Sequence, residues 1–209
     1  MSGQIALPLG WPPRPRDDAF LVTASNAHAA HLLDHWGAWP VLAALLVGPR
    51  KSGRSLLARI FAAKSGGRVI DDAERAPEEQ LFHAWNDAQA MRRPLLMVAD
   101  APPPRWTITL PDLRSRLAAG IVAEIGAPDD QLVRALLAAQ FERRGLDARA
   151  DLIDWLAARL ERSHVAVIRT VDVLDQEVLE TRKRLSIPLA RTALRAAGLI
   201  ANPERLEGA

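Results

Sequence analysis

Residues 48–55 read Gly48-Pro49-Arg50-Lys51-Ser52-Gly53-Arg54-Ser55 and nearly match a phosphate-binding loop. That pattern is a glycine, four residues, a second glycine, a lysine, and then serine or threonine, and here Arg54 replaces the lysine. In such a loop, backbone N–H groups and the N-terminus of the next helix, here near Leu56, point at a phosphate. The segment therefore predicts a nucleotide site over residues 48–56.

The segments on both sides of this loop support the prediction. The apolar run Val41–Val47 is typical of a buried parallel strand, and residues 56–63 favour a helix. Ser55 would place its hydroxyl on a magnesium ion, whereas Arg54 is planar and bulkier than lysine, which predicts binding with weak hydrolysis. The alternative is a glycine-rich turn that binds nothing.

Composition narrows the class of protein. The 209 residues are 49% hydrophobic and include no cysteine, which excludes disulfides and cysteine–zinc sites and fits a reducing compartment. We see no signal peptide and no apolar run of about 18 residues, so we expect a cytoplasmic protein without a membrane contact. The net charge of +2 does not argue for nucleic-acid binding, and the basic run at 182–184 is typical of a helix C-terminus.

The order of expected elements predicts an α/β fold. Strands at 41–47, 68–72, 95–99 and 121–125 alternate with helices, which indicates a three-layer parallel sheet. From Asp129 onward only helices are expected, near 130–145, 147–162, 163–184 and 186–198. We therefore predict an extended tail (1–16), a nucleotide-binding α/β domain (17–127) and a small helical domain (128–209).

Acidic residues follow two of the predicted strands. Asp71 and Asp72 end the strand after the loop, where Asp71 would hold magnesium together with Ser55 and Asp72 would lie beside the nucleotide. Asp72 is shorter than the glutamate that hydrolases place there, so water activation is expected to be weak. Asp100 would either orient the terminal phosphate or cap the loop before Pro102.

The stretch Leu110-Pro111-Asp112-Leu113-Arg114-Ser115-Arg116-Leu117 resembles the arginine-finger box of DnaA-type AAA+ proteins. The resemblance implies that Arg116 acts catalytically in trans, in the nucleotide site of a neighbouring subunit. It also implies that Phe20 and Asn26 lie where the family wraps the adenine. An arginine that only neutralises a surface acid is the alternative for Arg116.

Residues 4–9, Gln4-Ile5-Ala6-Leu7-Pro8-Leu9, resemble the sliding-clamp-binding peptide of Hda-like DnaA paralogues. Gln4 would hydrogen-bond at the rim of a groove, while Ile5, Leu7 and Leu9, with Pro8 between them, would fill it. Residues 181–188 resemble the start of the last helix of the same proteins, which also carry arginine in the phosphate loop. A short apolar segment that packs on the chain's own surface is the alternative.

This resemblance implies partners, cofactors and a function. The partners would be the sliding clamp (the polymerase beta subunit) and the DnaA initiator, without sequence-specific DNA binding, and a homodimer is left open. ADP or ATP, with magnesium, would be the cofactor. The expected function is negative regulation of replication initiation through ATP hydrolysis stimulated in DnaA. The alternatives are a clamp adaptor with impaired nucleotide binding and a stand-alone weak ATPase.

The sequence departs from the family in three places. Only 15 residues separate Ser55 from Asp71, so one β-α unit at the edge of the sheet is expected to be deleted. The sensing arginine of the helical domain falls near Val165, with Arg162 and Arg169 about a turn away on either side. The initiator's DNA-binding domain has no counterpart in these 209 residues.

Overall fold

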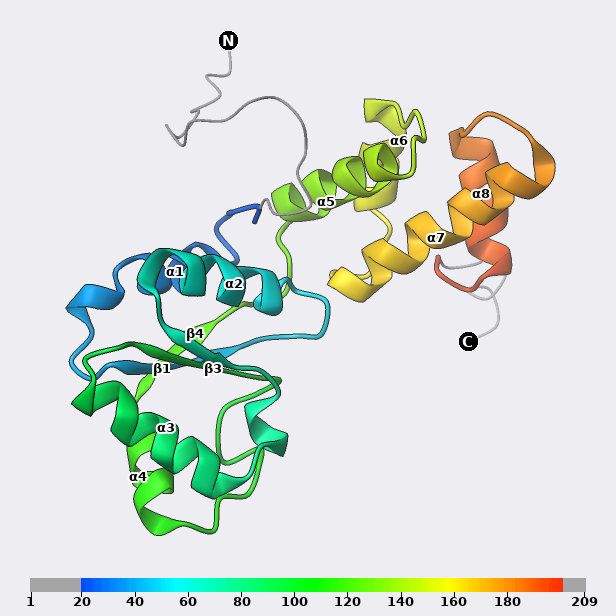
Figure 1. Ribbon diagram of the computed structural model, residues 1–209. Coiled ribbons are helices and arrows are strands. Elements are labelled where there is room, and N and C mark those ends of the chain that lie inside the picture. The colour runs from blue at the N-terminus through cyan, green and yellow to red at the C-terminus, as the bar shows by residue number, and fades with distance from the viewer. Residues whose placement is uncertain (1–19, 201–209) are drawn as a thin grey trace.

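The computed structural model describes residues 20–200 of the chain, which form a layered α/β part followed by a helical part (Figure 1). The tail residues that were predicted to bind the clamp, Gln4, Ile5, Leu7, Pro8 and Leu9, lie outside the described residues.

The sheet has the expected parallel arrangement. Its strands are β1 (Ala43–Val47), β2 (Arg68–Ile70), β3 (Leu95–Ala99) and β4 (Ile121–Glu124), in the order β2-β3-β1-β4. The central pair aligns Ala43 with Leu95 and Val47 with Ala99, so the carboxyl ends of β1 and β3 lie side by side. Both central strands are buried throughout, as a sheet covered on two faces requires.

Helices cover both faces of this sheet (Figure 1). One face carries α1 (Ala27–Asp34) and α2 (Arg54–Ser65), and the other carries α3 (Glu78–Ala90) and α4 (Pro111–Ala119). Alternate residues of β1 point to opposite sides: Leu46 packs beneath α2, and Leu45 packs beneath α3. Two short 3-10 turns, η1 (Trp36–Ala38) and η2 (Ala73–Arg75), complete this part.

The described chain contains no strand between α2 and β2. Only Gly66 and Gly67 separate the two elements, and β2 forms one edge of the sheet. Gly66 has φ +66 at the C-terminus of α2, a left-handed conformation that glycine adopts without strain. This arrangement is what the deletion of a β-α unit at the sheet edge predicts.

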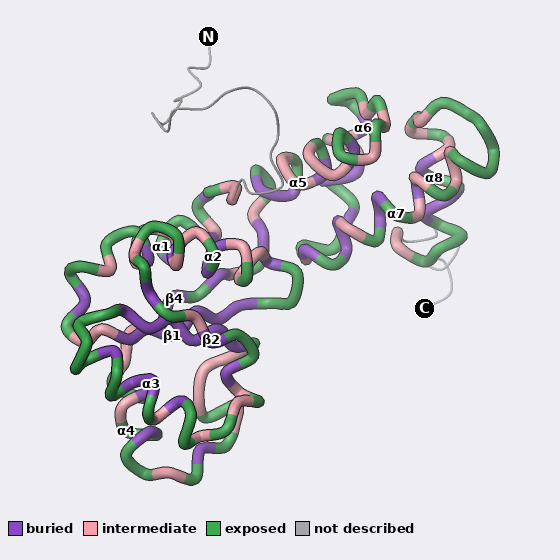
Figure 2. Tube along the Cα trace, in the orientation of Figure 1, coloured by how far each residue is buried: buried purple, intermediate pink, exposed green. Residues whose placement is uncertain are grey.

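The helical part consists of α5 (Asp130–Arg143), α6 (Ala150–Ala157), α7 (His164–Thr181) and α8 (Ile187–Ala196). Its separate core is formed by fully buried side chains, among them Leu137, Phe141, Leu156, Val171 and Leu174. Figure 2 shows the buried positions of these helices facing one another.

Caps explain where these helices begin. Asp129, Ser163 and Ser186 each accept a hydrogen bond from a backbone N–H three residues later. The prediction of a helix over 147–162 was too long, because α6 spans only 150–157. Ser163 has the extended backbone of an N-cap (φ −139, ψ 145), so the chain leaves the helical conformation before α7.

Candidate nucleotide site and arginine finger

The loop between β1 and α2 has a backbone that requires its two glycines. A Cβ atom on Gly48 would lie 2.7 Å from the backbone oxygen of Ile125, the residue that follows β4. Gly53 has φ +89, and a Cβ atom there would lie 3.1 Å from the ring of Phe20. The chain therefore turns sharply from the end of β1 into α2, as the glycine spacing predicted.

The first turn of α2 leaves donors available to a ligand. No side chain caps this helix at Gly53, so its first N–H groups have no intrahelical partner. The hydroxyl of Ser52 is buried and has no hydrogen-bond partner among the described residues. Lys51 has φ +66 and is exposed together with Pro49 and Arg50. Unsatisfied donors at a helix N-terminus fit a phosphate group.

Arg54 does not extend freely from this loop. Its guanidinium donates to the backbone oxygen of Ala99 and forms an ion pair with Asp100, at the end of β3. Its side chain is only 13% exposed. Two residues predicted for the site, Arg54 and Asp100, thus meet and neutralise each other, so a phosphate must compete with the carboxylate for this cation.

Ser55 and Asp71, the two residues that the sequence predicts to hold magnesium, lie close together. The Ser55 hydroxyl donates to Asp71 Oδ2 at 3.1 Å, across the carboxyl ends of the strands. Among the described residues, no three His, Cys, Asp or Glu side chains group together as a metal cage. Magnesium beside a nucleotide usually takes one or two protein oxygens and completes its shell with phosphates and water, so this pair fits.

Asp72 and Glu74 shape the loop beyond Asp71. Asp72 is exposed with φ +48, and its N–H donates to Asp71 Oδ1 at 3.0 Å, which orients that carboxylate. Glu74 accepts from the backbone N–H of Asp100 at 3.3 Å, and its other carboxylate oxygen is buried without a partner. The sequence analysis did not identify Glu74, because nothing in its local pattern marks it.

Phe20 and Asn26, the two residues expected near the adenine, differ in whether their side chains are free to contact a base. Phe20 lies over Gly53, which brings an aromatic ring to the phosphate loop. Asn26 is buried, and its amide group is used within the chain: Oδ1 accepts from Thr23 N–H and Nδ2 donates to Leu21 C=O, both at 2.8 Å. Asn26 therefore folds the segment before α1, and Phe20 remains the better candidate for a base contact.

The helical part supplies no free arginine at the predicted sensor position. Val165 occupies it and is 41% exposed. Arg162 forms an ion pair with Asp130, and this pair raises the pKa of Arg162. Next to Val165, His164 is buried with Nδ1 unpartnered, and desolvation lowers the pKa of its imidazole.

Arg116 is held in a defined orientation on α4. Its guanidinium donates to Asn86 Oδ1 at 2.6 Å, pairs with Asp112 at 2.7 Å, and lies 4.7 Å from the ring centre of Phe82. The side chain remains 27% exposed, and none of these partners belongs to the phosphate loop. Asn86 and Phe82, on α3, were not identified from the sequence, because the contact joins residues about 30 positions apart.

Glu78 fixes the start of α4 and thereby the position of Arg116. Its carboxylate accepts hydrogen bonds from the N–H groups of Thr109 and Leu110, at distances of 2.7–3.0 Å. These bonds, that of Thr109 first, lower the pKa of Glu78. The finger helix is therefore tied to the first turn of α3.

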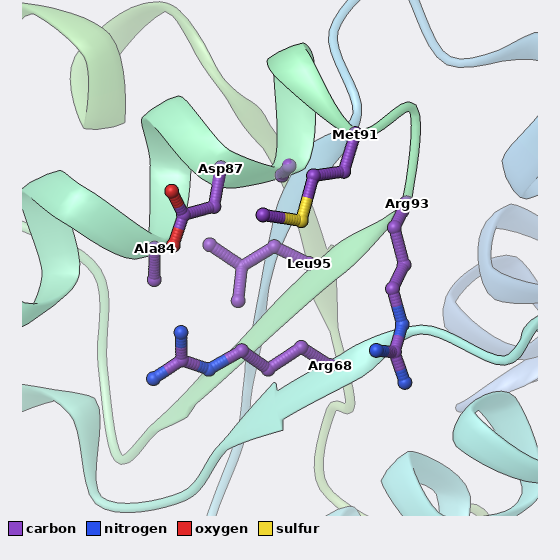
Figure 3. A pocket seen from close by; sticks show the side chains of 7 residues that line it. Arg68, Ala84, Asp87, Met91, Arg93 and Leu95 are labelled. Carbon is purple, nitrogen blue, oxygen red and sulfur yellow. The ribbon is translucent and has the colours of Figure 1, made fainter.

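A separate pocket lies between α3 and the edge of the sheet (Figure 3). Its volume is about 120 Å³, and it is lined by Arg68, Ala84, Asp87, Ala88, Met91, Arg93 and Leu95. None of the residues predicted for the nucleotide site lines this pocket.

Comparison with known proteins gives a family match and matches to curated proteins. Residues 129–194 match the family described as Hda, lid domain. An uncharacterized protein of Haemophilus influenzae is 29% identical over 119 residues, which cover 56% of this chain and 51% of that protein. The chain thus spans about half the length of the curated relative it matches.

Solved structures share the fold. Domain III of the replication initiation protein DnaA of Thermotoga maritima superposes with a TM-score of 0.69 at 17% identity, over 92% of this chain and all of that one. DnaA of Aquifex aeolicus, solved with AMPPCP, gives a TM-score of 0.57 at 18% identity, over 77% and 65% of the two chains.

The comparisons agree with the fold expected from the sequence. None of the described helices is long and apolar enough to cross a membrane. The four-stranded parallel sheet and the helical part together reproduce the fold of domain III of DnaA. Residues 129–194 are therefore similar to the Hda lid domain, and the chain shares the fold of domain III of DnaA.

Proposed function

We propose that this protein is a negative regulator of replication initiation that stimulates ATP hydrolysis by the DnaA initiator. Arg116 would enter the initiator's nucleotide site and stabilise the charge that develops on the transferring phosphate. The tail residues 4–9 would hold the protein on the DNA-loaded sliding clamp in the cytoplasm. The chemistry takes place in the partner, so this chain is not a stand-alone enzyme.

The orientation of Arg116 is the observation that carries this proposal. A trans-acting arginine must be preformed and accessible, and it must not be consumed by its own nucleotide site. Arg116 is anchored by Asn86, Asp112 and the ring of Phe82, and part of its side chain stays exposed. Because the anchors limit its rotamers, less conformational entropy is lost when it docks against a phosphate.

The chain's own nucleotide would have a structural role in this proposal. ADP, with magnesium at Ser55 and Asp71, would bridge the loop and stabilise the fold. The pairing of Arg54 with Asp100 removes the free cation that a hydrolytic loop places between phosphates. A regulator tolerates this loss, whereas an efficient ATPase does not.

Single-turnover hydrolysis tests the proposal. The cognate initiator is loaded with ATP and mixed with DNA-loaded clamp and this protein. We expect acceleration on the order of 10³-fold or more, as trans-acting arginines provide, and none from Arg116→Ala. If the native protein gives no acceleration, the proposed function is wrong.

A clamp adaptor with an impaired nucleotide site is the second candidate, favoured by the Arg54–Asp100 pair and by Val165. Calorimetric titration with ADP separates the two. Undetectable binding at millimolar ADP, with clamp binding intact, would favour the adaptor, whereas micromolar binding would exclude an impaired site.

A further inference from the structure

The lid carries its positive charges in two different ways. Three arginines of the lid each have an acidic partner: Arg134 pairs with Asp154, Arg144 with Asp172, and Arg162 with Asp130. Residues 181–200 hold five basic residues and no acid, and of these five only Arg184 has an acidic partner among the described residues, Asp147 at 3.8 Å. These five are Arg182, Lys183, Arg184, Arg191 and Arg195.

Arg191 and Arg159 meet at one tryptophan. The guanidinium of Arg159 lies 4.6 Å from the ring centre of Trp155, and that of Arg191 lies 5.8 Å from it. Arg159 also donates to the backbone oxygen of Trp155 at 3.1 Å. The ring joins the end of α6 to α8 and orients both guanidinium groups by cation–π contact.

Arg195 extends this cluster by one helical turn along α8. Arg191 and Arg195 are both exposed, and neither forms an ion pair with any residue between 20 and 200. Like charges four residues apart on a helix destabilise it slightly. In the absence of a bound anion, Arg191 and Arg195 therefore lower the stability of α8. We call Arg159, Arg191 and Arg195, with Trp155, the α6–α8 arginine face.

The α6–α8 arginine face lacks the apolar anchors of a protein-binding surface. The large hydrophobic residues that are exposed among the described ones are Val22, Met91, Val122, Val165 and Leu179, and none lies on α6 or α8. Protein interfaces depend on buried apolar and aromatic anchors, whereas binding to a nucleic-acid backbone depends on cations that neutralise phosphates. Arg159 and Arg191, which are oriented on the ring of Trp155, present guanidinium groups of the kind that bind phosphates.

We propose that the α6–α8 arginine face binds the phosphate backbone of duplex DNA without sequence preference. This inference goes beyond the proposed function and needs neither the arginine finger nor the nucleotide. It differs from the expectation based on net charge, because +2 for the whole chain does not reveal the basic segment at residues 181–200.

Fluorescence anisotropy with a short labelled duplex of mixed sequence tests the proposal, with no initiator, clamp or nucleotide present. At about 0.1 M salt we expect roughly tenfold weaker binding for Arg191→Glu/Arg195→Glu than for the native protein. The slope of log Kd against log salt should fall by about two. Arg191→Lys/Arg195→Lys keeps both charges and should bind within about threefold of the native protein.

The matched control is Arg59→Glu/Arg105→Glu, which changes the charge equally at exposed positions of the α/β part. The control should keep native DNA binding, and thermal melts verify that each variant folds. The inference is overturned if the native protein does not bind the duplex, or if the control loses as much affinity as the lid variant. Displacement of the duplex by poly-glutamate at equal charge would assign the face to an acidic protein instead. Because the assay contains no initiator, its result is independent of the hydrolysis test.

Discussion

The α/β part and the lid differ in how many of the predicted nucleotide-site residues they supply. The α/β part contains the closely packed loop at Gly48 and the Ser55–Asp71 pair, and it has no strand between α2 and β2. The lid keeps the family's sequence and a packed core, yet it places Val165 where the sensing arginine is expected. Under the proposed function, ADP binding would therefore depend on the α/β part.

We expect the largest loss of stability from a cavity in the core of the lid. Leu156 is fully buried, so Leu156→Ala should lower the free energy of unfolding by about 2–5 kcal/mol. Urea unfolding measures this loss. If the two parts act separately, ADP affinity measured on the folded variant stays native, and a parallel loss of ADP affinity would show that the lid does contribute.

Adding a side chain at Gly48 should lower the stability of the α/β part. In Gly48→Ala the new Cβ atom meets the backbone oxygen of Ile125, and the strain should cost about 1–3 kcal/mol. Calorimetry should also detect a large loss of ADP affinity. Gly37→Ala is the control, because a Cβ atom there meets nothing within 4 Å, and equal losses from both variants would argue against the loop geometry.

An arginine at position 165 tests whether the lid can contribute to ADP binding. Val165→Arg should tighten ADP binding by roughly tenfold, since a hydrogen bond to a charged group contributes about 1.5–3 kcal/mol and the helix N-terminus opposes the new cation slightly. Leu179→Arg adds the same charge at an exposed site on α7 and should change nothing. An unchanged affinity for Val165→Arg would place this helix away from the nucleotide.

The buried imidazole of His164 gives the smallest effect, a dependence on pH. Desolvation lowers its pKa below 6.5, so below that pH the unfolded chain binds more protons than the folded one. Stability is therefore complete above pH 6.5 and falls as the pH decreases, by at most about 1.4 kcal/mol per pH unit from this group. His164→Leu should reduce the difference between the urea midpoints measured at pH 7.5 and at pH 5.5. His28→Leu, at an exposed position, should leave that difference unchanged.

Local patterns predicted the elements of the fold well. The apolar runs became β1 and β3, and the spacing between Ser55 and Asp71 predicted the shortened sheet edge. These features depend on burial and on chain length, which a sequence displays directly.

Contacts between distant residues could not be predicted. Arg54 meets Asp100, and Arg116 meets Asn86, only after the strands and helices have packed, and no periodicity reports such a distance. Asn26 was expected near the adenine, but its amide satisfies backbone groups of its own loop. The same residue type serves either role, so sequence position alone does not distinguish them.

The role of Arg116 is tested most directly by comparing two arginines of one helix in the initiator's single-turnover ATPase assay. Arg114 and Arg116 both lie on α4, but only Arg116 is anchored by Asn86, Asp112 and Phe82. We predict that Arg114→Ala retains most of the stimulation, whereas Arg116→Ala abolishes it and Arg116→Lys restores only a small part. Equal stimulation by Arg116→Ala and the native protein would contradict the account.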